Sequence, residues 1–274
     1  MKGKKKIYIL LAFLAVFCVT LTACGKKDAD NSVKDIKDKK TLVMGTSADY
    51  PPFEFPIVQD GKKKVVGYDV FIAQKIADKL GVKLKIVNTE FPSLVSELKN
   101  NKVDIVMAGM VSTKERKKQV GFSNSYFEVQ NQALVKKGEA NKYKQKGTDF
   151  KNKSVGVQQT TTQETIAKKQ MKGANVVSES KVPSLTTELK KGKLDAVVVE
   201  NTVAADYVKK FPNDYEIAPA KLDTPKDLQN INIATRKSDK KLDKEINKIL
   251  ADLKKSGELD KMLDKAQTLQ SEKE

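Results

Sequence analysis

Short apolar segments alternate with amphipathic segments along most of this 274-residue chain. Residues 42–45 and 82–86 have the apolar character of strands. Between them, apolar side chains recur at the spacing of one helix face, namely Val70, Ala73, Ile76, Ala77 and Leu80. Gly81 follows where such a helix would end. The same alternation predicts further strands and helices in 94–108, 154–199 and 232–266. This order predicts an α/β fold whose parallel-dominated sheets are covered by helices.

Two segments of the chain repeat one pattern. LKNNKVDIVMAG (98–109) and LKKGKLDAVVVE (189–200) share Leu, Lys, Lys, Asp and Val at the same offsets, as expected for a helix end, a polar turn and a buried strand. Chance similarity between two such units is one explanation, and two related Rossmann-like lobes are the other. Parallel sheets bind ligands beyond the carboxyl ends of their strands. The second explanation therefore predicts that Gly109 and Glu200, which align, face one another across a cleft.

The two lobes would be joined by chain segments that cross between them twice. Residues 126–130 and 226–231 are the expected crossings, and two crossing strands would form a hinge. The predicted boundaries are 41–130 plus 226–270 for lobe 1 and 131–225 for lobe 2. The ligand would lie in the cleft between the lobes.

The N-terminal segment predicts export and anchoring. Residues 1–6 are basic, and the apolar stretch 7–19 is too short for a permanent membrane span. Leu-Thr-Ala-Cys at 21–24 resembles a bacterial lipobox, although an ordinary signal peptide with an incidental cysteine is the alternative. We therefore expect residues 1–23 to be a signal peptide and 24–40 to be a lipidated (palmitoylated) Cys24 followed by a flexible polar tether. The protein would then lie on the outer face of the cell membrane.

The charge of the chain favours polyanions other than nucleic acid. The formal net charge is +17, and removing residues 1–23 takes away four lysines and leaves +13. The positive residues are dispersed among carboxylates, without the interleaved aromatic residues that a nucleic-acid stacking surface needs. Anionic lipid head groups or cell-wall polyanions are the more plausible partners.

The composition argues against an enzyme. The chain contains no histidine, and its two cysteines, Cys18 and Cys24, lie in the N-terminal segment. A Ser-His-Asp or Cys-His arrangement cannot be assembled from these residues, nor can a zinc site of the usual nitrogen and sulfur ligands. We therefore expect no enzyme activity, metal or cofactor.

Arg116 is one of only two arginines, against 50 lysines. A guanidinium differs from an ammonium because its flat fork can grip a carboxylate through two parallel hydrogen bonds. Arg116 also follows an apolar run, 103–108, that breaks at Gly109 into small and hydroxyl residues, which is typical of a ligand-facing strand end. A surface arginine in the first turn of a helix is the alternative.

Six segments together resemble the amino-acid-binding proteins of ABC importers, the extracytoplasmic solute-binding lipoproteins of Gram-positive bacteria. They are TSADYPPFEF (46–55), VGYDV (66–70), AGMVSTKERKKQVGFSNSY (108–126), VGVQQTTTQE (155–164), LDAVVVENTVAADY (194–207) and IATRKSD (233–239). The resemblance covers residues 42–266. It implies a monomeric receptor that closes on a free α-amino acid and delivers it to an ABC permease and its ATPase.

The resemblance also implies a set of ligand-binding residues. Arg116, with the backbone N–H groups of Val111 and Thr162, would bind the α-carboxylate. The Gly109 carbonyl and the Glu200 carboxylate would hold the α-ammonium. The rest of the expected set is Tyr50, Phe91, Ser47 and Thr161, of which Tyr50 and Phe91 would form side-chain walls. Simple N-capping by Thr162, a solvated Glu200 and core positions for the two aromatic residues are the alternatives.

The chain departs from the family pattern at several of these positions. Val111 lacks a hydroxyl that relatives often carry, and Glu200 is longer than the common Asp. Thr160 replaces a frequent Gly, so the backbone there must avoid positive φ or accept strain. Ser47 stands where relatives that bind cationic amino acids often carry an acid, which favours a neutral polar ligand such as glutamine or cystine, with arginine left open. We expect a structural role for Asp69.

The sequence also allows two other functions. A basic surface adhesin for host or cell-wall polyanions is the main alternative. The other is an enzyme, because a few relatives of this fold act as dehydratases on cyclic acids, and Glu200 or Glu54 would then have to be the acid–base group.

Overall fold

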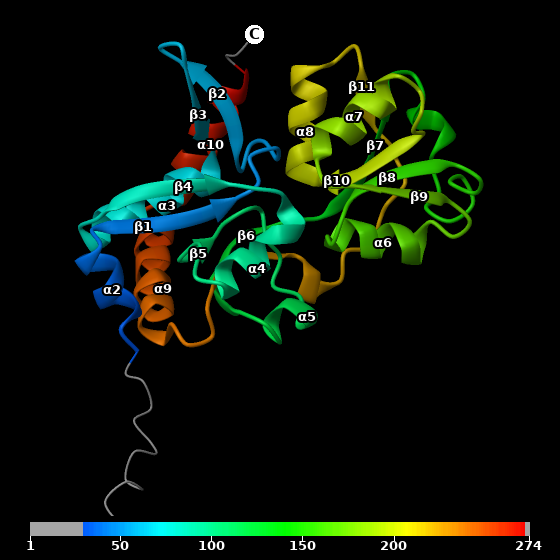
Figure 1. Ribbon diagram of the computed structural model, residues 1–274. Coiled ribbons are helices and arrows are strands. Elements are labelled where there is room, and N and C mark those ends of the chain that lie inside the picture. Colours follow the sequence, from blue (N-terminus) through cyan, green and yellow to red (C-terminus); the bar gives the residue numbers. More distant parts are fainter. Residues whose placement is uncertain (1–29, 272–274) are drawn as a thin grey trace, which may run out of the picture. The chain divides into compact units, whose positions relative to one another are not determined.

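The computed structural model describes residues 30–271 (Figure 1). The predicted signal peptide and Cys24 lie outside the described residues. None of the helices described there is both long and apolar enough to cross a membrane. The chain from Ser32 onward forms one compact unit, which contains two five-stranded sheets.

The first sheet has the strand order β4-β1-β5-β12-β6. We call this sheet and its helices lobe 1. Its strands are β1 (Thr41–Thr46), β4 (Lys83–Asn88), β5 (Ile105–Val106), β6 (Gly121–Glu128) and β12 (Asn230–Thr235). Its helices are α2 (Ser32–Asp38), α3 (Tyr68–Leu80), α4 (Leu94–Lys99), α5 (Lys114–Lys117), α9 (Lys240–Lys255) and α10 (Glu258–Ser271), with the short 3-10 helix η1 (Phe91–Ser93).

The second sheet has the strand order β11-β7-β10-β8-β9, and we call it and its helices lobe 2. Its strands are β7 (Asn131–Lys136), β8 (Ser154–Gln158), β9 (Asn175–Glu179), β10 (Ala196–Glu200) and β11 (Tyr215–Ile217). Its helices are α6 (Thr162–Gln170), α7 (Val182–Lys190) and α8 (Asn201–Lys210). The 3-10 helices η2 (Ala140–Lys142) and η3 (Lys226–Leu228) lie in the connecting segments.

The prediction of two α/β lobes with parallel-dominated sheets is confirmed, because four of the five strands in each sheet run in the same direction. Parallel pairs join β1 to β4 and β5 in lobe 1, and β8 to β9 and β10 in lobe 2. The other pairs, β12 with β5 and β6 and β7 with β10 and β11, are antiparallel. The one reversed strand is β12 in lobe 1 and β7 in lobe 2, and each is the strand that the chain enters directly after crossing from the other lobe.

The two crossings run side by side, as the predicted hinge requires. Asn230 in β12 pairs with Glu128 in β6, and the Val129 N–H donates to the Gln229 carbonyl at 2.8 Å. Just beyond, the Gln130 N–H donates to Oδ1 of Asn201 at 3.0 Å. Lobe 1 and lobe 2 are therefore joined by two paired strands.

The aspartate shared by the two repeated segments has the same position in both lobes. Oδ2 of Asp104 accepts the Val43 N–H at 2.8 Å, and Oδ2 of Asp195 accepts the Ser154 N–H at 2.8 Å. Each carboxylate thus satisfies a backbone N–H near the start of the neighbouring parallel strand, β1 or β8, where an unpaired group would be costly.

Asp104→Ala should therefore destabilise the fold. The variant leaves the Val43 N–H without its acceptor and breaks the ion pair of Asp104 with Lys39, so we expect a loss of about 1–3 kcal/mol in the free energy of unfolding. Urea unfolding would measure it against Asp252→Ala, an exposed acid on α9. Equal stability of the two variants would contradict the role given to Asp104.

The prediction of a flexible tether over residues 24–40 is wrong for residues 32–38. Residues 32–38 form α2, and Ile36 on this helix is only 1% exposed. The Leu242 N–H at the start of α9 donates to Oγ of Ser32 at 3.2 Å. Because Ile36 belongs to the main hydrophobic core and Val33 packs against that core, this part of the charged segment joins the folded unit.

Two further features differ from the sequence expectation. The C-terminal helical segment is interrupted at Gly257, where φ is +68°, so the segment forms two helices, α9 and α10. An unpredicted hairpin joins β2 (Phe55–Gln59) to β3 (Lys62–Val66). Its turn is Asp60-Gly61, both at positive φ, which is the strongest local hairpin signal in a sequence.

Candidate functional site

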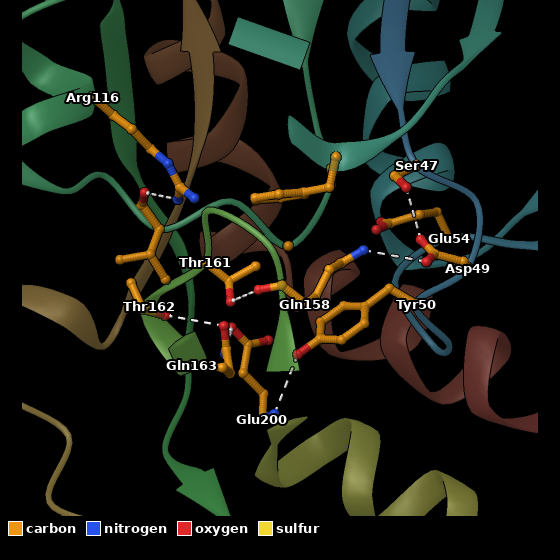
Figure 2. Close-up of a pocket in the computed structure, with 14 residues that line it drawn as sticks. Ser47, Asp49, Tyr50, Glu54, Arg116, Gln158, Thr161, Thr162, Gln163 and Glu200 are labelled. Atoms are coloured by element: carbon orange, nitrogen blue, oxygen red, sulfur yellow. Dashed lines mark hydrogen bonds between the residues drawn. The ribbon is translucent and has the colours of Figure 1, made fainter. Parts of the chain in front are cut away.

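A pocket lies where the carboxyl ends of strands from both lobes meet (Figure 2). Its volume is about 320 Å³, including open solvent at its mouth. All nine residues expected from the sequence line it: Ser47, Tyr50, Phe91, Gly109, Val111, Arg116, Thr161, Thr162 and Glu200. Five further lining residues were not in that set: Asp49, Glu54, Ala108, Gln158 and Gln163.

Arg116 is held by contacts from both lobes. Its guanidinium donates from Nη1 to the Val111 carbonyl at 2.7 Å and from Nη2 to the Thr160 carbonyl at 2.9 Å, and Cζ lies 5.0 Å from the centre of the Phe91 ring. Thr113 caps α5 and accepts the Arg116 N–H at 3.2 Å. Burial lowers the pKa of Arg116 to about 10, and the charge of Glu200 opposes this shift. The guanidinium therefore stays charged at neutral pH and keeps three N–H donors for a ligand.

Gly109 and Glu200 face one another across the pocket, as the repeat predicts. A Cβ atom on Gly109 would lie 3.8 Å from Oε2 of Glu200 and 3.2 Å from the Tyr50 ring. Gly109 also has φ +54°, so glycine is needed here for both space and conformation. The Glu200 N–H donates to the Tyr50 hydroxyl at 3.2 Å, which brings the two lobes together beside the pocket.

Glu200 has the environment of a cation site. It is 2% exposed; Oε1 accepts from Nε2 of Gln163 at 3.2 Å, and Oε2 has no hydrogen-bond partner among the described residues. Burial raises the pKa of Glu200 to about 8, against the opposing hydrogen bonds from Gln163 and Tyr50. An ammonium group beside Oε2 would favour the charged carboxylate and supply its missing partner.

Asp69 supports the pocket from behind. Its Oδ2 accepts the Gly109 N–H at 2.9 Å, and its Oδ1 accepts the Tyr126 hydroxyl at 2.7 Å. Burial raises the pKa of Asp69 to about 6. Because Tyr126 belongs to the crossing strand β6, Asp69 ties the backbone of Gly109 to the hinge. This position agrees with the structural role expected for it.

The start of α6 opens onto the pocket. The N-cap is Thr161, whose hydroxyl accepts the Glu164 N–H at 3.3 Å, and Thr162 is the first helical residue. Simple capping, the alternative weighed for Thr162, is therefore done by its neighbour. A helix start with free N–H groups favours an anion, which agrees with the expected carboxylate end of the ligand.

Thr160 adopts a strained backbone conformation, which is one of the two possibilities predicted for this position from the sequence. Its φ is +62°, a conformation that costs a β-branched residue about 1–2 kcal/mol. The position is exposed, and its backbone both donates to Glu164 and accepts from Arg116. The backbone contacts, rather than the side chain, thus hold this turn.

Thr160→Gly should stabilise the protein. Relief of the strain exceeds the added backbone entropy of glycine, so we expect about 0.5–1 kcal/mol more stability in urea unfolding. Asn152→Gly is the control, because Asn152 has φ +61° but is a residue type that tolerates it. Lower stability of the Thr160 variant would show that its side chain has a role not seen in these contacts.

Glu54 is the lining residue with the least ordinary environment. It is fully buried, and no N–H of the described residues reaches either carboxylate oxygen, although Asp69 is close enough to share a proton. Burial raises the pKa of Glu54 well above its usual range, and the negative charge of Asp69 raises it further. The sequence did contain a signal for this residue, since Glu54 is an acid inside the apolar run 52–57. Burying an unpaired charge costs free energy, so an acid in such a run indicates a special role.

The other lining residues depend on contacts between segments far apart in sequence. Gln163 donates from Nε2 to Oδ1 of Asn131 at 2.8 Å as well as to Glu200. Gln158 donates to Asp49 in the opposite lobe at 3.2 Å. No local pattern marks these residues. Among residues 30–271, no group of three or more His, Cys, Asp or Glu side chains is arranged to hold a metal ion.

Two α/β lobes, a paired-strand hinge and a pocket with a cation from one lobe and a carboxylate from the other define a receptor for a small solute. The model of the bacterial extracellular solute-binding proteins, family 3, matches residues 42–267, and the chain belongs to this family. The family is one of transport proteins that bind solutes.

Named relatives and a solved structure agree with this assignment. The chain is 36% identical over 259 residues to the arginine-binding extracellular protein ArtP of Bacillus subtilis, covering 94% of this chain and 96% of ArtP. It is 31% identical to the L-cystine-binding protein TcyJ of Escherichia coli K12, covering 93% and 94%. The crystal structure of the substrate-binding protein AbpA of Streptococcus pneumoniae bound to L-arginine matches with a TM-score of 0.84 and 35% identity, over 88% of this chain and all of that one. The expected class, an extracellular amino-acid-binding protein of an ABC importer, is confirmed.

Proposed function

We propose that this protein binds free L-arginine between its lobes and presents it to the permease of an ABC importer. The single observation that carries the proposal is the buried Glu54 carboxylate in a pocket that already has Arg116 and Glu200. The named function of ArtP and the arginine in the AbpA structure support the same ligand.

The charges of the pocket favour a cationic side chain. The α-carboxylate of an amino acid would pair with Arg116, and its α-ammonium with Glu200 and the Gly109 carbonyl. This pairing leaves Glu54, whose two oxygens have no N–H donor within residues 30–271. A guanidinium matches a carboxylate with two parallel hydrogen bonds, whereas an uncharged side chain would leave Glu54 protonated.

This proposal changes the preference drawn from Ser47 alone. A hydroxyl at that position favoured a neutral polar ligand such as glutamine or cystine. In the structure Oγ of Ser47 donates to Oδ1 of Asp49 at 2.8 Å, and Glu54 lines the pocket, so an acid at another position, Glu54, supplies the negative charge that Ser47 lacks. Glutamine and cystine become the comparison ligands for the test.

The anchoring and the domain boundaries remain part of the proposal. We propose that Cys24 carries lipid and holds a monomer on the outer face of a Gram-positive cell membrane, with lobe 1 formed by 41–130 plus 226–270 and lobe 2 by 131–225. The adhesin alternative rests on the net charge and stays a prediction. Its contacts with polyanions should weaken as salt is added, whereas a closed pocket should be much less affected.

Isothermal titration with L-arginine, L-citrulline, L-glutamine and L-cystine tests the ligand. Citrulline matches arginine in shape but lacks the charge, so we expect about 100-fold weaker binding of citrulline. Thermal unfolding gives an independent reading, because arginine at 100 times its dissociation constant should add ~2.7 kcal/mol to stability. Equal affinity for citrulline and arginine would refute the cationic ligand, and a folded protein that binds no amino acid would refute the function.

A further inference from the structure

Asp49 joins lobe 1 to lobe 2 beside the pocket. It lies in the segment that follows β1, and its Oδ1 accepts the hydroxyl of Ser47 in its own lobe. Its Oδ2 accepts two donors from lobe 2: the Val182 N–H at 2.9 Å and Nε2 of Gln158 at 3.2 Å. Figure 2 shows Asp49 and Gln158 on the Tyr50 side of the pocket, away from Arg116.

The Val182 N–H belongs to a helix start that its own lobe leaves uncapped. Val182 is the first residue of α7, and the side chain of the N-cap residue, Lys181, makes no capping hydrogen bond. The first N–H groups of a helix have no acceptor within the helix, and a carboxylate there is also favoured by the helix dipole. Asp49 therefore acts as the cap of α7, supplied from the opposite lobe.

Lobe 2 presents its second donor in a fixed orientation. Nε2 of Gln158 donates to the Ser180 carbonyl at 3.0 Å as well as to Asp49. Gln158 and Val182 come from the end of β8 and the start of α7, so both donors are set by the fold of lobe 2. The Asp49 carboxylate thus has two donors from lobe 2 in addition to Ser47 of its own lobe.

We propose that Asp49 is a closure residue, which holds lobe 2 against lobe 1 by capping α7 and thereby slows release of the bound amino acid. This role goes beyond the proposed function, because it concerns the closed form of the receptor and not the identity of its ligand. It acts on the side of the pocket opposite to the bond between Arg116 and the Thr160 carbonyl.

A double-mutant cycle tests the bond directly. Asp49→Ala removes the acceptor, and Val182→Pro removes the donor. Proline is tolerated at the first position of a helix, and Lys181 already has φ −131° and ψ 133°, which suit a residue before proline. Each single variant should raise the dissociation rate of L-arginine about tenfold in stopped-flow measurements, and Asp49→Ala should add less than about twofold in the Val182→Pro background.

Glu90→Ala is the matched control. Glu90 is another carboxylate of lobe 1 that faces lobe 2, with Lys181 at 4.0 Å, but it is half exposed and its side chain makes no capping hydrogen bond. Its loss should change the dissociation rate less than about twofold. Full additivity of the Asp49 and Val182 variants, or an unchanged rate in Asp49→Ala, would overturn the proposal.

Two measurements on the protein without added amino acid test the closure role independently of the identity of the ligand. In Asp49→Ala the Val182 amide should exchange with solvent faster, and small-angle scattering should show a larger radius of gyration, while circular dichroism stays that of the wild type. If Val182→Pro fails to fold, Gln158→Ala takes its place in the cycle with amide exchange as the readout. A protein that shows these changes but binds no arginine refutes the proposed ligand and keeps the closure role, whereas unchanged exchange and radius refute the closure role itself.

Discussion

Arg116→Lys is expected to weaken L-arginine binding about 100-fold, although the positive charge is kept. The guanidinium bonds the carbonyls of Val111 and Thr160 through different nitrogens and still has three N–H groups for a carboxylate. A single ammonium cannot span both carbonyls and also grip a ligand through two bonds, and it loses the flat contact with Phe91. Isothermal titration would measure the loss.

Arg236→Lys is the control for this substitution, since Arg236 is the other arginine of the chain. Its guanidinium bonds Asp239 at 2.8 Å and the Val103 carbonyl at 2.7 Å, within lobe 1 and away from the pocket. The variant should lower stability and leave the affinity unchanged. If Arg116→Lys binds arginine as the wild type does, Arg116 does not hold the carboxylate.

Glu54→Gln is expected to weaken L-arginine binding about 100-fold and to leave L-citrulline binding unchanged or improved. The substitution keeps the shape of the side chain and removes the charge that would pair with the guanidinium. The ratio of the two dissociation constants, measured by titration, is the readout. A loss of affinity that is the same for both ligands would mean that Glu54 shapes the pocket without selecting the charge.

The Glu54 variant should fold. The folded-state pKa of Glu54 lies above its unfolded value because of burial, so ionising this carboxyl costs stability as the pH rises past the unfolded pKa. A neutral glutamine removes that cost, and thermal unfolding at pH 7 should show no loss. Glu90→Gln, which changes the same charge on a half-exposed side chain, should alter neither stability nor ligand choice.

Much of the fold followed from local patterns. The apolar face of 70–80 and its Gly81 stop became α3, and the strands and helices expected in 154–199 begin with β8 at Ser154. The chain has no local signal for the reversed direction of β7 and β12 in their sheets, because strand pairing is a long-range choice. The place of Ile36 in the core was equally hidden, since α2 is buried only by contact with lobe 1.

Gly109, Arg116 and Glu200 could be predicted from residue patterns, because the α/β fold brings the carboxyl ends of its strands to one edge of each sheet, whereas the other six expected pocket residues followed from the resemblance to the family. Thr160 could be given only as a choice between two conformations, because its φ of +62° is fixed by bonds to Glu164 and Arg116. Glu54 could be noticed as an acid in an apolar run, but the lack of an N–H donor to it among the described residues is a property of the assembled pocket.

The sequence by itself determined the two-lobed α/β architecture, the class of receptor, and the guanidinium and carboxylate that face each other across the pocket. Only the tertiary structure decided how the lobes hold one another and which charge is left over for the ligand. The Asp49 cap on α7 joins residues 133 positions apart in the chain, and the buried environment of Glu54 needs Asp69 beside it. Such pairings depend on distances between folded segments, and the energies of buried charges are set by what surrounds them and not by the residues next to them in sequence.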